Sequence, residues 1–462
     1  MFQLLLNKFQ TFLDSLPISD PGSEKKIARF IFPVDSSFYN NSRNILFSSR
    51  NHSFFWNQPK ESLFFHSLGR IDFEKVLNFK ELFLKKHSFN YLKENIITNQ
   101  EFPSSVRIPL FIGNSPFSSF KADSIWNEYF NINWFIPKLI LLLDNSTSLM
   151  VYNFLIKNEK NEIISDFKRH IDTILTPTGT TSMQPGHASI GSRKDLSPSI
   201  WKDMVNNALA EIRNDSIEKV VLSRMAEFDV NGELTIEQID KIAAQYADCV
   251  TFYHGTGDSA FFGITPERLL KIKDGIIETE SLAGSIKRSA SRREDDILAG
   301  QLLNSGKNLY EQKLVTDYIT GILNEYCENI NFNGTPNLKK LENIQHLKTN
   351  FSAVLKKDKF FFSLVNSLHP TPAVCGLPKD AAYNFILNNE GYERGLYSGI
   401  TGWFNENGEG DFAVAIRSAL KNGRKLYVFG GCGIVEGSDP DAEYEETEIK
   451  MKPIFSIFGY GN

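Results

Sequence analysis

Apolar residues recur every three or four positions in several stretches of the chain, which is the spacing of one helix face. In residues 201–212 the apolar positions follow this spacing, and Ser197-Pro198 before them suits an N-cap followed by a first helical residue. The same pattern predicts helices over residues 1–16, 73–84, 201–212, 307–323 and 440–450.

Short runs rich in β-branched and aromatic residues predict strands. Asn422-Gly423 between two such runs is a strong hairpin signal, so we expect residues 412–420 to pair antiparallel with residues 425–429. Strands are predicted at residues 44–47, 148–155, 219–228, 260–264, 268–272, 412–420 and 425–429. Helices and strands together predict an α+β protein, with a loop at residues 176–199 that joins two regions.

Composition excludes several classes of protein. The 462 residues are 41% hydrophobic and 23% charged, as in folded globular proteins, and 50 basic against 55 acidic residues give a net charge of −5. Neither a nucleic acid nor a membrane partner is expected, because no positive excess exists and the most apolar stretch, 134–143, is too short to span a bilayer. The four cysteines form no CxxC pair, which favours a reducing, cytoplasmic compartment.

Two groups of acidic residues are candidates for chemistry. Glu311 lies just before the apolar face of the helix 307–323, so its carboxylate points inward or to the edge of a cleft, although a glutamate at the rim of the core gives the same pattern. Glu443, Glu446 and Lys450 share one face of the last helix, an arrangement that a solvated, salt-bridged face would also give.

A glycine-rich run precedes that last helix. Gly431 and Gly433 leave backbone N–H groups bare, and such groups can hold a carboxylate or a phosphate. A dinucleotide-binding motif is not indicated, because the GxGxxG spacing is absent and a hairpin precedes the glycines.

Four further side chains are candidates for catalysis or ligand binding, and for each a structural or surface role is the alternative. Arg417 lies on one strand face with two alanines and has room for a carboxylate ligand, or it is a surface arginine of a sheet. Lys219 begins a strand and would act as a base if it were buried, whereas most such lysines are exposed. Glu267 in a tight turn is an acid of raised pKa or a solvent-facing residue. His369 precedes two prolines, Pro370 and Pro372, that would make its loop rigid and suit a functional role, although a structural histidine fits equally well.

Taken together, these residues resemble the chorismate-utilising enzymes, and among them the isochorismate synthases. The matching stretches occur in the family's order: KVVLSR from Lys219, FFGITPERLL from Phe261, ESLAGS from Glu280, KNLYEQKLV from Lys307, SLHPTPAVCG from Ser367, YERGLYSGITGWF from Tyr392, VAIRSAL from Val414 and GCGIVEGSDPDAEYEETEIK from Gly431. The resemblance implies an α+β fold, an α/β two-layer sandwich with large, mainly antiparallel sheets packed together and helices outside. It also implies that residues 1–195 form a variable N-terminal region packed on the core and that residues 196–462 bind chorismate.

The implied reaction adds water at C2 of chorismate while the C4 hydroxyl leaves, which gives isochorismate. In this resemblance Lys219 matches the base that activates water and Glu267 matches the acid that protonates the leaving hydroxyl. Relatives that use ammonia do not normally have lysine at this position, so we expect water as the nucleophile and no obligatory glutaminase subunit. Hydroxide is a poor leaving group and water a poor nucleophile at neutral pH, so the reaction needs both groups.

The resemblance also implies an Mg²⁺ site and a substrate pocket. Glu311 and Glu446 match the metal ligands, with Glu443 acting through water, and carboxylate oxygens suit this ion. The positions that match the family's substrate-binding residues are Ala283, Gly284, His369, Tyr397, Arg417, Gly431, Gly433 and Lys450. Gln312 departs from the histidine that many relatives have after the glutamate, which affects only the surroundings of the metal ligand.

Two other functions remain compatible with the sequence. A salicylate synthase shares the same acid, base and metal residues and goes on to eliminate pyruvate from isochorismate. A catalytically silent chorismate-binding subunit would be expected to lack one of these residues, and all are present. The last glycine-rich and acidic stretch is more similar to the menaquinone-type enzymes than to the siderophore type.

Overall fold

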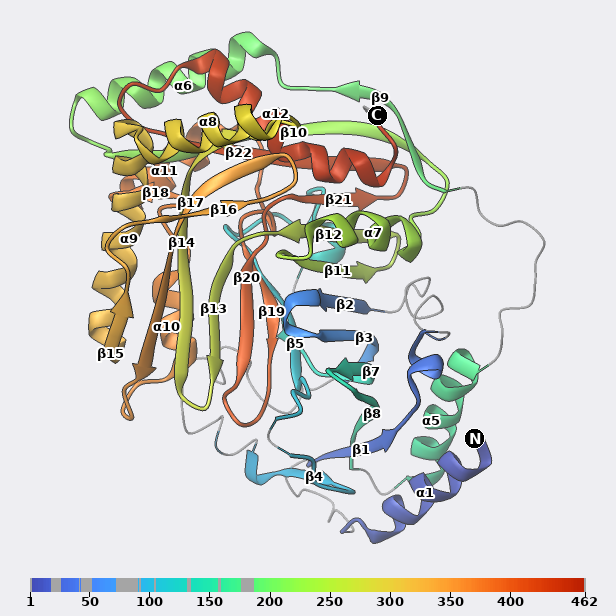
Figure 1. Ribbon diagram of the computed structural model, residues 1–462. Coiled ribbons are helices and arrows are strands. Elements are labelled where there is room, and N and C mark those ends of the chain that lie inside the picture. Colours follow the sequence, from blue (N-terminus) through green and yellow to red (C-terminus); the bar gives the residue numbers. More distant parts are fainter. Residues whose placement is uncertain are drawn as a thin grey trace.

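The structure is a computed structural model that describes residues 2–17, 26–40, 42, 52–71, 90, 93–103, 105–130, 134–156, 159–175 and 187–460. In these ranges, 13 strands form one sheet and nine form another (Figure 1). The predicted helix at 73–84 and the predicted strand at 44–47 lie outside the described residues, as do residues 176–186 of the predicted loop at 176–199. The loop prediction is wrong over residues 189–194, which form a strand paired to residues 227–231.

The larger sheet combines strands from both halves of the chain. Its strands in spatial order are β18 (Gly376–Leu377), β10 (Lys219–Asn231), β22 (Lys425–Ile434), β21 (Ser418–Asn422), β12 (Ser259–Thr265), β11 (Val250–Thr256), β2 (Ser53–Gln58), β3 (Leu63–Arg70), β7 (Pro137–Asp144), β8 (Thr147–Leu155), β1 (Ile27–Pro33) and β4 (Ile96–Thr98), with β9 (Ser189–Lys194) paired to β10. The sheet therefore runs without interruption from the N-terminal strands to the C-terminal ones.

The smaller sheet is also shared between the two halves. Its order is β15 (Cys327–Phe332), β17 (Ile344–Leu355), β14 (Ile276–Lys287), β13 (Arg268–Lys273), β20 (Gly410–Val414), β19 (Ile400–Phe404), β5 (Phe111–Ser115) and β6 (Trp134–Phe135), with β16 (Asn337–Lys340) paired to β17. Among the described strands only β1 and β4 pair in parallel, so the expectation of large, mainly antiparallel sheets is confirmed.

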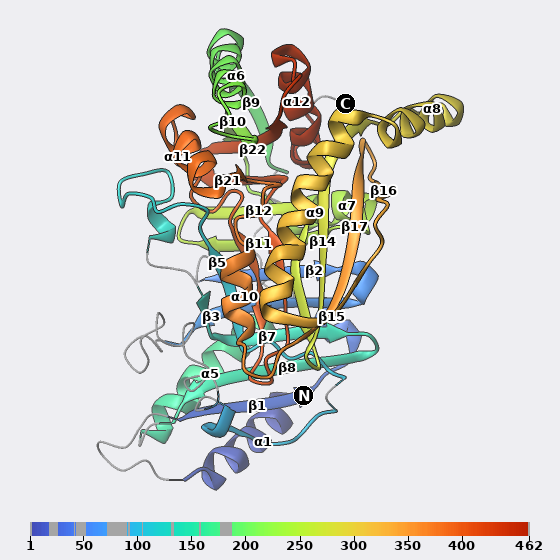
Figure 2. The same cartoon turned by 90° about the vertical axis from the view of Figure 1, so that its left-hand side faces the viewer.

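Helices cover the outer faces of both sheets (Figures 1 and 2). The smaller sheet is covered by α9 (Gly306–Tyr326) and α10 (Phe361–Leu368), and α8 (Arg292–Leu303) precedes α9. The larger sheet is covered by α6 (Pro198–Arg213), α7 (Ile236–Ala243), α11 (Lys379–Asn389) and α12 (Pro440–Ile457) at one end and by α1 (Phe2–Ser15) and α5 (Lys160–Leu175) at the other. None of the helices in the described ranges is long and apolar enough to cross a membrane.

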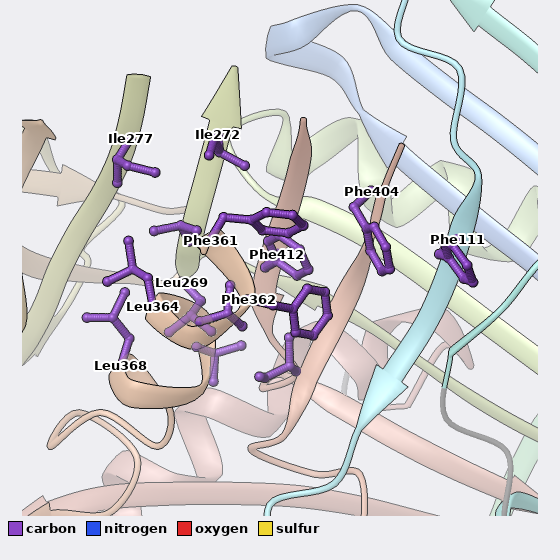
Figure 3. Close-up of a cluster of buried hydrophobic side chains, with 14 of the residues drawn as sticks. Phe111, Leu269, Ile272, Ile277, Phe361, Phe362, Leu364, Leu368, Phe404 and Phe412 are labelled. Atoms are coloured by element: carbon purple, nitrogen blue, oxygen red, sulfur yellow. The ribbon is translucent and has the colours of Figure 1, made fainter. Parts of the chain in front are cut away.

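The hydrophobic core has a layer between the sheets and layers under the helices. Between the sheets, Trp56 and Phe65 of the larger sheet share one buried cluster with Trp403 of the smaller sheet. Under α10, the buried rings of Phe361 and Phe362 pack against strands β13, β19 and β20 (Figure 3). These apolar layers exclude water from the region where the sheets meet.

The predicted helices at 1–16, 201–212, 307–323 and 440–450 and the predicted strands at 148–155, 219–228, 260–264 and 268–272 are confirmed. The prediction of one strand over 412–420 is wrong. The chain leaves the smaller sheet after Val414 and enters the larger sheet at Ser418, and the hairpin turn to β22 consists of Gly423-Arg424 rather than Asn422-Gly423. Arg417 in the break has φ +49°, so it does not share a strand face with the alanines as predicted.

Candidate active site

Two passages of the chain from one sheet to the other lie side by side and form the centre of the site. The first leads from β12 through Pro266 and Glu267 to β13, and the second leads from β20 through residues 415–417 to β21. Val414 N donates to the carbonyl of Glu267 at 3.0 Å, and Ile264 N donates to the carbonyl of Arg417 at 3.0 Å. These bonds fix Glu267 and Arg417 relative to each other although they are far apart in sequence.

A cavity opens at these passages, and residues of both passages line it. Four of the predicted site residues do not line the cavity but contact residues that do: Lys219, His369, Glu443 and Glu446. The predicted residues that line it are Glu267, Ala283, Gly284, Glu311, Tyr397, Arg417, Gly431, Gly433 and Lys450. The fold thus brings the residues predicted from the sequence together around one cavity.

Lys219 lies at the start of β10 and is fully buried. Its Nζ is 2.9 Å from Oε1 of Glu311 on α9, which lines the cavity. Gly433 on β22 lies beside this pair, because a Cβ atom there would overlap Oε1 of Glu311 and lie 3.0 Å from Cε of Lys219. The bare backbone at Gly433 therefore gives the pair the space it occupies.

Glu267 is 5% exposed and carries an unusual carboxyl group. Burial and the negative charge of Glu280 raise its pKa to about 7, against the attraction of Lys219, Lys339 and Lys450. A carboxyl with this pKa is still partly protonated at neutral pH, so it can donate a proton. The alternative of a solvent-facing turn residue is excluded by its burial.

Arg417 is buried and contacts a residue that sequence analysis did not select. Its Nη2 donates to Nε2 of His346 at 3.1 Å, and Nδ1 of His346 lies 2.9 Å from Oγ of Ser285. Burial, followed by the charge of Arg417, holds the pKa of His346 well below its usual value, so the imidazole is neutral and accepts the bond. The guanidinium remains available to the cavity that it lines.

The carboxylates of α12 lie on the side of the cavity next to α9. Glu446 pairs with Lys450 at 2.6 Å, and Glu443 pairs with Lys307 at 2.6 Å. Lys450 also donates to the carbonyl of Gly431 at 3.0 Å. Burial and the charge of Glu446 raise the pKa of Glu443, which is the effect of two carboxylates close together.

The remaining predicted residues shape the cavity wall. A β-bulge at Gly284, which has φ +72°, turns Ala283 and Gly284 toward the cavity. Tyr397 stacks on Phe429 with ring centroids 4.9 Å apart. His369 does not line the cavity; burial lowers its pKa to about 4, and its Nε2 donates to the carbonyl of Ser398, which does.

The comparison with known families agrees with this geometry. The family model described as chorismate binding enzyme matches residues 22–459. The chain belongs to this family. Its members bind chorismate by that description, and the match extends over both sheets.

Related proteins are named as isochorismate synthases. The chain is 30% identical over 416 residues to isochorismate synthase MenF of Bacillus subtilis (strain 168), which covers 88% of each chain. It is 37% identical over 275 residues to the salicylate biosynthesis isochorismate synthase of Pseudomonas aeruginosa, covering 60% of this chain and 57% of the relative. The fold is that of the menaquinone-specific isochorismate synthase MenF of Escherichia coli, with a TM-score of 0.80 at 22% identity over 99% of both chains.

Sequence analysis did not identify His346 and Glu280 as site residues. His346 contacts Arg417 from a strand 71 residues away, and Glu280 lies behind Glu267 although its stretch was part of the resemblance. The ESLAGS stretch was the one available signal for Glu280, and no local motif marks His346. Each residue matters through a partner that only the folded sheets bring near.

Proposed function

We propose that the protein is an isochorismate synthase, an isomerase that converts chorismate to isochorismate. The observation that carries this proposal is a cavity lined by the buried carboxyl of Glu267 and by Glu311, which is paired with the buried amine of Lys219. The cations Arg417 and Lys450 line the same cavity. Chorismate has two carboxylates, and Arg417 at the cavity complements one of them. The names of the relatives support the same activity.

Glu267 is the general acid in this proposal. The C4 hydroxyl leaves as water only if it receives a proton as its bond to carbon breaks, and a carboxyl with a pKa of about 7 can supply that proton near neutral pH. Val414 N bonded to the Glu267 carbonyl fixes the backbone from which the acid extends. No net proton is consumed, because the attacking water gives up one proton while Glu267 supplies one to the leaving hydroxyl.

Lys219 is the general base that accepts that proton. Its burial keeps bulk water away from the amine, so the proton of the attacking water passes to a group of the protein rather than to solvent. A base must be neutral to accept a proton, and Glu311 at 2.9 Å pairs with the ammonium form in the present arrangement. In the working enzyme the ion pair between Glu311 and Lys219 must therefore be weakened, so that Lys219 can lose its proton.

The carboxylates near the cavity suit an Mg²⁺ ion. Glu311 on α9 and Glu443 and Glu446 on α12 are hard oxygen donors near the cavity, and such donors suit this ion. In the described residues no group of three acidic, histidine or cysteine side chains is placed to hold a metal ion, so at most two of these carboxylates would bind the ion directly, and water and substrate would fill the other positions. When bound, Mg²⁺ would neutralise the ring carboxylate of chorismate and compete with Lys219 for Glu311.

The other cavity residues bind and orient the substrate. Arg417 and the backbone of Gly431 and Gly433 would bind the carboxylate of the enolpyruvyl arm, with Lys450 adding positive charge near Gly431. Tyr397, Ala283 and Gly284 shape the wall, and His369 acts through Ser398.

We further propose that the product serves menaquinone rather than siderophore synthesis, as in the menaquinone-specific relative, and that the protein works in the cytoplasm without a glutaminase subunit. Water as nucleophile needs no ammonia supply. Neither salicylate formation nor a silent role gains support from a particular residue of the cavity, and the relative associated with salicylate is itself named an isochorismate synthase.

The decisive experiment is product identification. The protein is incubated with chorismate and Mg²⁺, and the products are separated by chromatography and identified by mass and absorbance. We expect isochorismate. Salicylate as the final product would favour the synthase that eliminates pyruvate, and unchanged chorismate would contradict the proposal.

Substitution of the proposed acid and base tests their roles. Lys219→Ala and Glu267→Gln should each lower kcat by roughly 10²-fold or more, the usual contribution of a positioned acid or base. Circular dichroism should show that both variants keep the wild-type fold. Glu278→Gln, a half-exposed glutamate on the same sheet, is the matched control and should keep full activity.

Removal of divalent cations tests the proposed ion. Activity should fall to background in EDTA and return when Mg²⁺ is added in excess. Glu446→Gln should raise the Mg²⁺ concentration needed for half-maximal rate by at least about tenfold, since it removes a charged ligand. Full activity in EDTA would exclude the metal from the mechanism.

A further inference from the structure

Glu280 on β14 is a buried carboxylate behind the proposed acid. It is 8% exposed, and its oxygens accept hydrogen bonds from Nζ of Lys339 at 3.0 Å, from Nζ of Lys348 and from the backbone N of Arg268 at 3.1 Å. It does not line the candidate cavity but a second, outer one together with both lysines. Glu280 therefore cannot touch a substrate in the inner cavity.

Glu280 and Lys339 bind the backbone on both sides of Glu267. Glu280 accepts from the backbone N of Arg268, which follows Glu267, and Lys339 donates to the carbonyl of Pro266, which precedes it. Glu280 and Lys339 are themselves joined by an ion pair. The turn that carries the acid is thus fixed at both ends by one salt bridge from strands β14 and β16.

Glu280 also presents a fixed charge to Glu267. Burial acts against ionisation of Glu280, but Lys339 and Lys348 outweigh it and hold its pKa at about 2, so the group is negative at all physiological pH values. The charged groups that act on Glu267 from the surrounding elements are Glu280 on β14, Lys339 on β16, Lys219 on β10 and Lys450 on α12. Glu280 is the one negative charge among them.

We propose that Glu280 and Lys339 form a positioning pair for Glu267, in which the salt bridge fixes the turn and the two opposite charges set how readily the acid gives up its proton. This role rests on the proposed function of Glu267. The two members act in opposite directions, since the carboxylate disfavours ionisation of Glu267 and the ammonium favours it. Neither residue is catalytic, because each acts through Glu267.

Single-charge variants separate this role from a structural one. Glu280→Gln keeps the shape and an acceptor for Arg268 N but removes the negative charge, so the pKa of Glu267 should fall by on the order of one pH unit. Lys339→Gln removes the positive charge, and the pKa of Glu267 should rise, while Lys348 still keeps Glu280 ionised. Loss of packing alone would not move one group in opposite directions.

The pKa of Glu267 is measured directly in the full-length protein without substrate. Glutamate labelled with ¹³C at the carboxyl carbon gives a titrating NMR signal for each side chain, and the signal lost in Glu267→Gln assigns the one that matters. Wild type, Glu280→Gln and Lys339→Gln are titrated between pH 5 and 9. Glu278→Gln, on the same strand but half exposed, is the control and should leave the Glu267 signal unchanged.

Turnover of chorismate provides a second measurement. At pH 7, a fall of about one pH unit leaves roughly one-fifth of the protonated Glu267, so Glu280→Gln should lower kcat about fivefold with little change in KM. Glu280→Asp keeps the negative charge, but its shorter side chain loses the hydrogen bond from the backbone N of Arg268. It should therefore keep the pKa of Glu267 near that of the wild type while kcat falls, which separates charge from position.

The outcomes distinguish this inference from the proposed function. If the Glu267 signal stays in place in both Glu280→Gln and Lys339→Gln, or moves the same way in both, the positioning pair is overturned even when turnover is normal. If wild type forms no isochorismate but the signal moves as expected, the proposed function fails and the electrostatic pairing stands. Should one variant not fold, the other alone decides by the direction of its shift.

Discussion

A single carboxyl, that of Glu267, combines properties that rarely occur together. It lies in a passage between two sheets, it is almost completely buried, and its pKa is raised to about 7 by burial and by the charge of Glu280. A protein gains nothing in stability from burying an acid that ionises near neutral pH. The cost of keeping Glu267 there is therefore expected to appear in the pH dependence of unfolding.

Glu267→Gln should be stabilising at neutral and alkaline pH and nearly neutral in acid. Below pH 4.5 the carboxyl is protonated in both the folded and the unfolded chain, so the favourable burial of the neutral acid is fully present. As the pH rises through 7 the folded carboxyl is forced to ionise and this stability is lost, by about 3 kcal/mol relative to Glu267→Gln. Urea unfolding of both proteins at pH 4.5 and pH 8 measures the difference, and a difference that does not change with pH would contradict the raised pKa.

At the scale of elements, the site depends on where strands end. The run FAVAIRSAL was predicted as one strand because its apolar positions continue without a glycine or proline. Its two ends are buried in different sheets, so the sequence pattern does not show where the chain leaves the smaller sheet for the larger one. The helices α6, α9 and α12 were predictable because the spacing of apolar positions that predicts a helix lies within one element. The predicted N-cap Ser197 precedes α6, but its side chain makes no capping hydrogen bond.

The site residues were predictable to a similar extent and for a similar reason. Glu311, Glu443 and Glu446 stand out at helical spacing within one element. The contact of Arg417 with His346, by contrast, joins two strands that are distant in sequence, and no spacing within either strand encodes it. Sequence patterns therefore predicted which side chains matter on one element, and the fold was needed to find their partners.

Gly433 on β22 tests how closely two elements must approach. Gly433→Ala would place a methyl group against the flexible end of Glu311 and against Lys219, so the strand should still form while the pair is forced apart. We expect a loss of at least tenfold in kcat/KM with an unfolding midpoint close to that of the wild type. Gly300→Ala in α8 is the control, because its methyl group meets open space and an interior helix position gains up to about 1 kcal/mol from alanine.

At the scale of the whole molecule, the two halves of the chain share both sheets. Strand β2 pairs with β11 in the larger sheet, and β5 pairs with β19 in the smaller one. A salt bridge also joins Glu61 of the N-terminal half to Arg268, the residue that follows the proposed acid. The division into regions 1–195 and 196–462 stays a prediction, and these contacts indicate that the two regions depend on each other.

The fragment 196–462 should therefore not fold by itself. Without residues 1–195, β11 and β19 would become open edges, and the cluster between the sheets would lose Trp56 and Phe65. We expect this fragment to aggregate or to remain without cooperative unfolding, as seen by size-exclusion chromatography and near-UV circular dichroism. Expression together with 1–195 as a separate chain should restore a soluble, active complex. A monomeric fragment that unfolds cooperatively and makes isochorismate would mean instead that the N-terminal strands are an addition to a complete catalytic unit.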